Sequence, residues 1–166
     1  MKRVSKNILA IGGSDLTRKI FGFLSITYLT RHITVSDFGI VSIAFTVLSY
    51  VLILSASGLP ALGTREIARE FSQGLVARII SARLLLTIAV TVLTITVTLL
   101  FVSNPVVAAM IILISLSAIP NALFLDWFFQ GKEAMSIIGI ARAAAACLNF
   151  FIIILFVKSS TDILLV

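Results

Sequence analysis

Charged residues are scarce in this chain. Asp, Glu, Lys and Arg make up 12% of its 166 residues, whereas apolar residues make up 60%. An ordinary water-soluble domain carries about 25% charged residues, so the composition excludes that class and indicates an integral membrane protein. The scarcity is greatest from Leu84 to Leu125, a stretch in which no charged residue occurs.

Cysteine and histidine are almost absent. Cys147 is the only cysteine and His32 the only histidine, which excludes an internal disulfide and a metal site rich in Cys or His. The seven Asp and Glu residues are scattered along the chain, and it has neither a Gly-rich phosphate loop followed by Lys-Ser/Thr nor a Gly-x-Ser-x-Gly motif. We therefore expect no metal, no cofactor and no enzymatic activity.

What the chain has instead is a series of long apolar runs. Their length and continuity favour membrane-spanning helices over barrel strands, which would alternate over about ten residues. Asn104 and Pro105 predict a turn between the third run and the fourth. The sequence thus predicts an all-α polytopic membrane bundle forming a single domain over residues 1–166. Its five spans are expected at residues 8–30, 38–57, 84–102, 106–125 and 137–157.

A sixth apolar run begins at Ile163, and the sequence ends at Val166. So short a run cannot cross a bilayer, which needs about 20 residues of helix. The sequence therefore predicts a chain that stops inside its own architecture.

The basic residues set the expected orientation. With the N-terminus in the cytoplasm, eight of the thirteen Lys and Arg fall on the inner side, two (Arg31 and Lys158) on the outer side and three within spans. This bias predicts a multi-pass protein of the cytoplasmic membrane with a cytoplasmic N-terminus. It also explains the net charge of +6 without a nucleic-acid partner. The eight inner residues are Lys2, Arg3, Lys6, Arg65, Arg69, Arg78, Arg83 and Lys132.

The inner connector over residues 58–82 is expected to have structure of its own. Thr64 is placed to cap a short helix over residues 65–71. Ile67 and Phe71 would share one face of that helix, which suits a position on the membrane surface. Two interpretations stay open: a solvated connector whose arginines only set the topology, or a segment with a gating or substrate-admitting role.

The first span contains a cluster of charges. Asp15, Arg18 and Lys19 have the spacing i, i+3, i+4, which places them on one side of a helix, and Gly22 and Ser25 extend that side. Ionised side chains within a span usually face a bundle interior or a water-filled cavity. The alternative is that Arg18 and Lys19 lie near the inner interface and extend to the lipid headgroups. Arg18 and Lys19 are our first candidates for a substrate-binding cavity.

The fifth span contains a second such position. Gly139, Arg142, Ala146 and Asn149 line one face of the predicted helix. Arg142 either faces an interior cavity or reaches the headgroups from the inner end of the span. Because Asn149 extends the polar face to greater depth, we add Arg142 and Asn149 to the candidate cavity.

Hydroxyl groups form a stripe on the third span. Such a stripe is either a packing surface, with hydroxyls bonded to carbonyls of their own helix, or the lining of a cavity. The stripe consists of Thr87, Thr91, Thr94 and Thr98.

In the fourth span, Pro120 predicts a kink.

Two segments carry a resemblance to a known family. Residues 58–69 read Gly-Leu-Pro-Ala-Leu-Gly-Thr-Arg-Glu-Ile-Ala-Arg, and residues 126–133 read Asp-Trp-Phe-Phe-Gln-Gly-Lys-Glu. These resemble the connectors after the second and fourth helices of polysaccharide-export flippases in the multidrug/oligosaccharidyl-lipid/polysaccharide superfamily. The order and topology of the segments agree with that family along the whole chain. The motif residues are Gly58, Pro60, Gly63, Arg65, Arg69, Asp126, Trp127, Gln130 and Gly131.

The resemblance implies a fold and a substrate. The family fold has two lobes of six helices around a central cavity, and this chain is similar to most of the N-terminal lobe, so the C-terminal lobe would be a partner. The implied substrate is a polyprenyl-diphosphate-linked oligosaccharide, such as an O-antigen unit, moved from the inner to the outer leaflet by alternating access. Further implied partners are membrane lipids and the polysaccharide assembly machinery.

Two other functions stay open. One is a drug or small-molecule antiporter of the same superfamily, a branch that prefers carboxylates within the membrane, for which Asp15 is the only candidate. The other is a truncated product without transport activity.

Overall fold

The structure is all-α, as the sequence predicts. The computed structural model describes residues 2–70 and 72–158, so Phe71 and the apolar run from Ile163 lie outside the described residues. The helices in the described part are α1 (Lys2–His32), α2 (Val35–Ala56), α3 (Leu59–Arg69), α4 (Gln73–Phe101), α5 (Pro105–Leu116), α6 (Ala118–Ala122), α7 (Asp126–Gly131) and α8 (Met135–Phe156).

Four helical stretches are long and apolar enough to cross a membrane. They are Val35–Ala56, Gln73–Phe101, Pro105–Gly131 and Met135–Phe156, and they correspond to the second to fifth predicted spans. The first predicted span lies within α1, which is long enough to cross but carries the charges of Asp15, Arg18 and Lys19. The all-α membrane bundle is thus confirmed.

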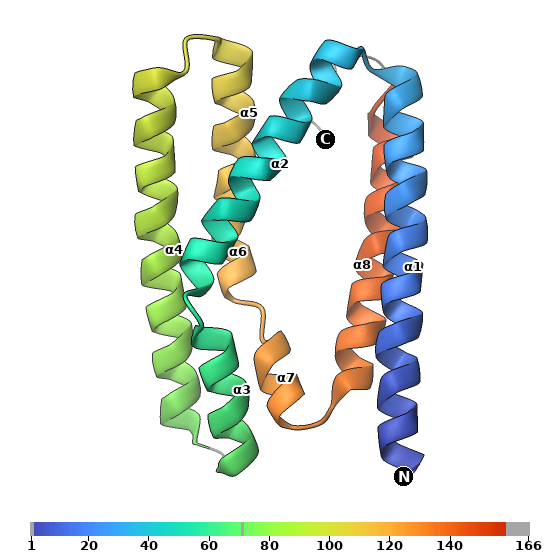
Figure 1. The fold of residues 1–166 in the computed structure, drawn as a ribbon, viewed down its shortest axis with the longest axis vertical. Coiled ribbons are helices and arrows are strands. Elements are labelled where there is room, and N and C mark those ends of the chain that lie inside the picture. Colours follow the sequence, from blue (N-terminus) through green and yellow to red (C-terminus); the bar gives the residue numbers. More distant parts are fainter. Residues whose placement is uncertain (1, 71, 159–166) are drawn as a thin grey trace. The chain divides into compact units, whose positions relative to one another are not determined.

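The chain divides into two compact units, which we describe separately. Unit 1 combines the segment up to Phe38 with the segment from Lys132 onward, and α1 and α8 lie side by side in it, running in the same direction (Figure 1). Near their C-terminal ends, Leu29, Ile33, Ile153 and Val157 form a buried apolar cluster. Burial of this apolar surface joins the first and last helices of the described chain.

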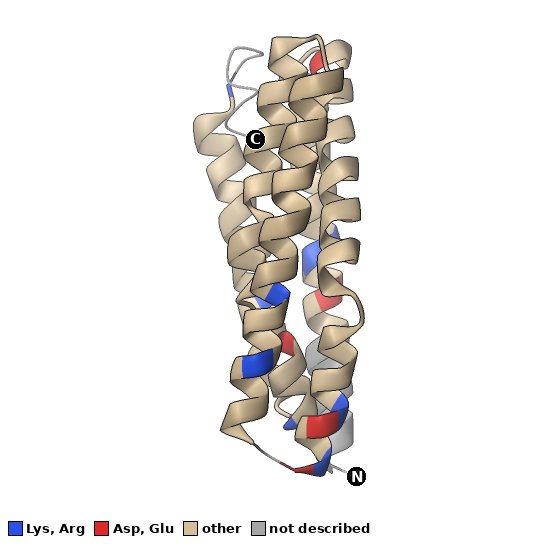
Figure 2. Cartoon of the chain, turned by 90° about the vertical axis from the view of Figure 1, so that its left-hand side faces the viewer, with Lys and Arg blue, Asp and Glu red and all other residues tan. Residues whose placement is uncertain are grey.

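Unit 2, residues 39–131, contains an antiparallel hairpin of α4 and α5 (Figure 1). The predicted turn at Asn104 and Pro105 is confirmed. The Asn104 side chain accepts hydrogen bonds from the amides of Val106 (2.9 Å) and Val107 (3.3 Å), and Pro105 occupies the first helical position, where no amide hydrogen is needed. The uncharged lengths of the long helices are drawn in tan in Figure 2.

The fourth predicted span is not one continuous helix. The kink predicted at Pro120 becomes a break at Ser117, three residues earlier, where the Ser117 amide donates to Ile114 O at 3.1 Å. Pro120 has no amide hydrogen for the carbonyl four residues before it, which accounts for a break at this position. A second break follows at Leu123–Leu125, between α6 and α7.

The prediction for the inner connector was wrong in three respects: the start of its helix, the role of Thr64 and the surface that its apolar face contacts. The connector helix, α3, begins at Leu59 rather than at residue 65, because Gly58 turns the chain with a φ of 75° and Pro60 suits a first turn. Thr64 therefore does not cap the helix; its hydroxyl lies inside α3 and donates to Pro60 O at 3.0 Å. Ile67 is buried in a cluster with Ile79 and Trp127, so its face of α3 packs on protein rather than lying on a membrane surface.

The threonine stripe of α4 is a packing surface. Thr87, Thr91 and Thr98 are buried. The hydroxyls of Thr87, Thr94 and Thr98 donate to the carbonyls four residues earlier, at 2.7 to 2.9 Å. These three hydroxyls can pack against a neighbouring helix without leaving an unpaired donor, whereas the buried Thr91 hydroxyl has no partner within the described residues.

Candidate functional site

An open groove runs between the two helices of unit 1. Arg18 and Gly22 of α1 line one side of the groove, and α8 lines the other. Its volume is about 330 Å³. The residues from α8 are Arg142, Ala145, Ala146 and Asn149.

The register of the two helices explains why these side chains meet. Phe21 packs on Phe150 with ring centroids 5.4 Å apart, and the Tyr28 hydroxyl donates to Val157 O at 3.1 Å. Both pairs are separated by 129 residues in sequence, which places Arg18 level with Cys147 in the parallel pair. Arg142 and Asn149 then lie within about two turns of that level, on the groove side of α8.

The groove is positively charged. Arginine stays protonated in proteins, so Arg18 and Arg142 bring two guanidinium groups to it. Asp15 Oδ1 lies 3.4 Å from Arg18 Nη2, as the i, i+3 spacing predicted, and partly offsets one of them. The side chains of Arg18 and Asp15 are 59% and 40% exposed, so this ion pair is open and can exchange Asp15 for another anion.

Three of the four predicted cavity residues line this one groove. Lys19 does not: it is exposed and is not among the lining residues, because its position is rotated by about 100° around α1 from that of Arg18. Small side chains at Gly22, Ala145 and Ala146 keep the space between the two arginines open.

The two motif segments, about 60 residues apart in sequence, form a helix pair in unit 2, α3 against α7 (Figure 1). A Cβ atom at Gly63 would overlap the buried ring of Trp127, and one at Gly131 would lie 2.8 Å from Ile67 Cβ. The single proton of the Thr64 hydroxyl is shared between Pro60 O of its own helix, at 3.0 Å, and Trp127 O across the interface, at 3.1 Å. These motif glycines therefore permit close helix packing, a role that the sequence analysis did not assign to them.

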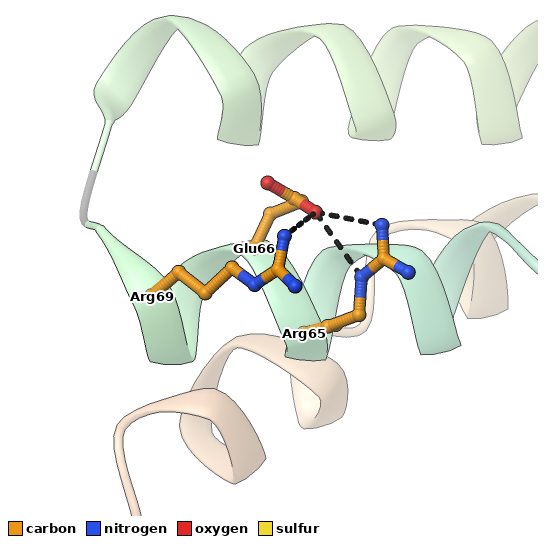
Figure 3. A network of polar contacts seen from close by, with 3 residues as sticks. All are labelled: Arg65, Glu66 and Arg69. Carbon is orange, nitrogen blue, oxygen red and sulfur yellow. Dashed lines mark hydrogen bonds and ion pairs between the residues drawn. The ribbon is translucent and has the colours of Figure 1, made fainter.

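The motif arginines are exposed on the surface of α3. Arg65 donates to Glu66 Oε1 from Nε (3.2 Å) and Nη2 (3.0 Å), and Arg69 Nη1 lies 3.8 Å from the same oxygen (Figure 3). The two arginine side chains are 63% and 68% exposed. Asp126 and Gln130 of the second motif are half-buried on α7.

Sequence reasoning gave no structural role to one further basic residue. Arg83 was counted only as an inner, topology-setting charge, yet its Nη1 donates to Phe124 O at 3.0 Å, 41 residues away. Its position directly before the uncharged stretch from Leu84 was the available signal. The described part of the chain holds no group of three or more His, Cys, Asp or Glu that could bind a metal ion.

Comparison with known proteins agrees with the motif segments. Residues 4–166 match the family described as polysaccharide biosynthesis protein. The chain belongs to this family. As a polysaccharide biosynthesis protein it is also similar to a protein of Shigella dysenteriae provisionally named as an O-antigen transporter, with 27% identity over 163 residues. That alignment covers 96% of this chain and 41% of the relative, so the chain spans less than half the length of the relative. No solved structure matches the chain.

Proposed function

We propose that this chain forms part of a transporter that moves a polyprenyl-diphosphate-linked oligosaccharide across the cytoplasmic membrane, and that the groove between α1 and α8 binds its diphosphate. The observation that carries the proposal is the convergence of Arg18 and Arg142 on one groove in a helical membrane protein of a polysaccharide biosynthesis family. The N-terminus would lie in the cytoplasm, as the distribution of Lys and Arg favours.

The chemistry of the substrate fits such a groove. A diphosphate joined to polar sugars cannot enter hydrocarbon without compensation for its lost hydration. Guanidinium groups bind phosphate oxygens in a bidentate manner, and Arg18 and Arg142 would bind the diphosphate from two sides. The Asn149 amide, at the same groove, can donate to a phosphate or sugar oxygen and accept from a sugar hydroxyl.

The remaining length of the relative suggests what completes the transporter. A second lobe would supply the opposite wall of the cavity, and rocking of the two lobes would give alternating access, as in other transporters built from repeats. The polyprenyl chain would remain among the membrane lipids. In this proposal the protein is a transporter rather than an enzyme, and the polysaccharide assembly machinery supplies and receives its substrate.

The antiporter alternative is weaker. It requires a carboxylate available to an organic cation, and Asp15 already pairs with Arg18 at 3.4 Å. A chain without transport activity is the second alternative, and it is an outcome of the following experiment.

Complementation tests the proposal. Residues 1–166 are expressed in a bacterium that lacks its own oligosaccharide flippase, alone and fused to the remaining part of the Shigella relative, and surface polysaccharide is measured at equal membrane level. We expect rescue by the fusion and none by the chain alone. Absence of rescue in both strains, with both proteins in the membrane, would contradict transport by this chain.

A further inference from the structure

Arg83 contacts a carbonyl that a break in the helix has left without its usual partner. In a continuous helix, Phe124 O would accept from the amide of Phe128. That amide instead donates to Leu125 O at 3.0 Å, because the chain between α6 and α7 is not helical. Arg83 Nη1 supplies the missing donor at 3.0 Å.

The surroundings of Arg83 fit a fixed rather than a freely moving side chain. Its Nε is buried and has no acceptor within the part of the chain that the structure describes. Since a partly desolvated guanidinium needs an acceptor, the hydrogen bond to Phe124 O fixes the end of this side chain.

The location gives this contact its importance. The break belongs to the apolar stretch Pro105–Gly131, where an unpaired backbone group near hydrocarbon would be costly. Trp127 lies three residues after Phe124, and its buried ring packs against Gly63 of α3. Arg83 is one helical turn beyond Ile79, which belongs to the same buried cluster as Trp127.

We propose that Arg83 is a positioning residue of the transporter: by donating to Phe124 O it holds the break between α6 and α7 and keeps Trp127 packed against α3. The effect on transport rests on the function proposed above, but the position of Trp127 does not. The two effects are therefore measured separately.

Trp127 reports its own position, because it is the only tryptophan of the chain. Fluorescence of the 166-residue protein in detergent is compared for the wild type, Arg83→Ala and Arg83→Lys. We expect a red shift and stronger acrylamide quenching in Arg83→Ala, and a return toward wild-type values in Arg83→Lys, whose ammonium retains a donor and the charge. The matched control is Arg78→Ala, an exposed arginine on the same helix, which should keep the wild-type spectrum.

Transport is measured in the fusion to the remaining part of the relative. At equal membrane level, Arg83→Ala should lose most of the transport of the wild-type fusion, and Arg83→Lys should retain a larger share. If Arg83→Ala does not accumulate, Arg83→Met replaces it; methionine keeps a long side chain but has no donor for Phe124 O, and this variant should produce the same red shift.

Two results would overturn the assignment. One is a wild-type Trp127 spectrum in Arg83→Ala, and the other is full transport by that variant at equal membrane level. If the unmutated fusion fails to transport, the function proposed above has failed, and the fluorescence comparison still decides whether Arg83 positions Trp127.

Discussion

Gly22 in unit 1 and the two motif glycines of α3 and α7 in unit 2 have opposite surroundings. In unit 1 a Cβ atom at Gly22 would meet nothing within 4 Å, and this position borders the arginine groove. In unit 2 a Cβ at Gly63 would overlap Trp127, and one at Gly131 would lie 2.9 Å from Thr64 O. Absence of a side chain thus leaves space open at Gly22 and lets α3 and α7 approach closely at Gly63 and Gly131. The open groove of unit 1 therefore differs from the packed α3–α7 interface of unit 2.

The largest effect on stability is expected in unit 2. Gly63→Ala forces the Trp127 ring away from α3, and overpacking of this kind costs about 1–3 kcal/mol of unfolding free energy, occasionally more. Thermal unfolding in detergent, followed by Trp127 fluorescence, should show a lower midpoint. Gly22→Ala is the control and should not lower the midpoint, because alanine favours a helix over glycine. An equal decrease of the midpoint in both variants would refute the distinction between the two glycines.

The groove arginines should affect transport rather than stability. Arg18→Ala or Arg142→Ala removes hydrogen bonds to an anionic group worth about 1.5–3 kcal/mol, which corresponds to roughly a 10- to 100-fold loss of transport. Surface polysaccharide is measured in the complemented strain at matched membrane level. Arg31→Ala, an exposed arginine of the same helix outside the groove, should transport normally. Normal transport by both groove variants would remove Arg18 and Arg142 from the binding site.

A larger side chain at Gly22 should narrow the groove without disturbing the fold. Gly22→Leu is expected to lower transport while the unfolding midpoint stays near the wild-type value, since the new side chain enters open space. Gly13→Leu is the matched control, because Gly13 is also exposed on α1 and a Cβ atom there would meet nothing within 4 Å, but it lies outside the groove. Equal transport by the two variants would show that the width of the groove at Gly22 does not affect transport.

The smallest effect is expected at the exposed ion pairs of α3. Glu66→Gln removes the carboxylate shared by Arg65 and Arg69, and exposed pairs contribute at most about 1 kcal/mol. The unfolding midpoint should shift only slightly, and the shift should vanish at high salt. A decrease of the unfolding midpoint as large as that of Gly63→Ala would mean that this ion-pair network, rather than the Gly63–Trp127 contact, holds α3 in place.

Much of the site could be predicted from the sequence because helical periodicity is a local property. The spacing of Asp15 and Arg18 predicted a shared face, and the ion pair at 3.4 Å confirms it. Arg142 and Asn149 were assigned to one face of their span, and both line the groove. Lys19 was not excluded, because sequence spacing alone does not tell which edge of a helical face meets a neighbour.

The sequence analysis missed the early start of α3, which Gly58 and Pro60 set locally, and the contacts that Thr64 and Arg83 make with distant segments. Thr64 has the residue type of an N-cap, but Gly58 starts α3 earlier, and the Thr64 hydroxyl then bonds to Trp127 O, 63 residues away. No local pattern indicates that a carbonyl at Phe124 lacks a partner, so Arg83 was understood only as a topological charge.

The amino-acid sequence by itself determined the all-α membrane class, the apolar runs and the helix faces on which the charges of the predicted spans lie, because these follow from hydrophobicity and the 3.6-residue period. Only the tertiary structure decided that α1 and α8 run parallel, with Arg18 and Arg142 lining one groove. It also decided that the two distant motifs pack together through Gly63 and Trp127, and that Arg83 donates to a carbonyl at the break between α6 and α7. The physical reason is that packing partners are selected by shape and unpaired polar groups across the fold.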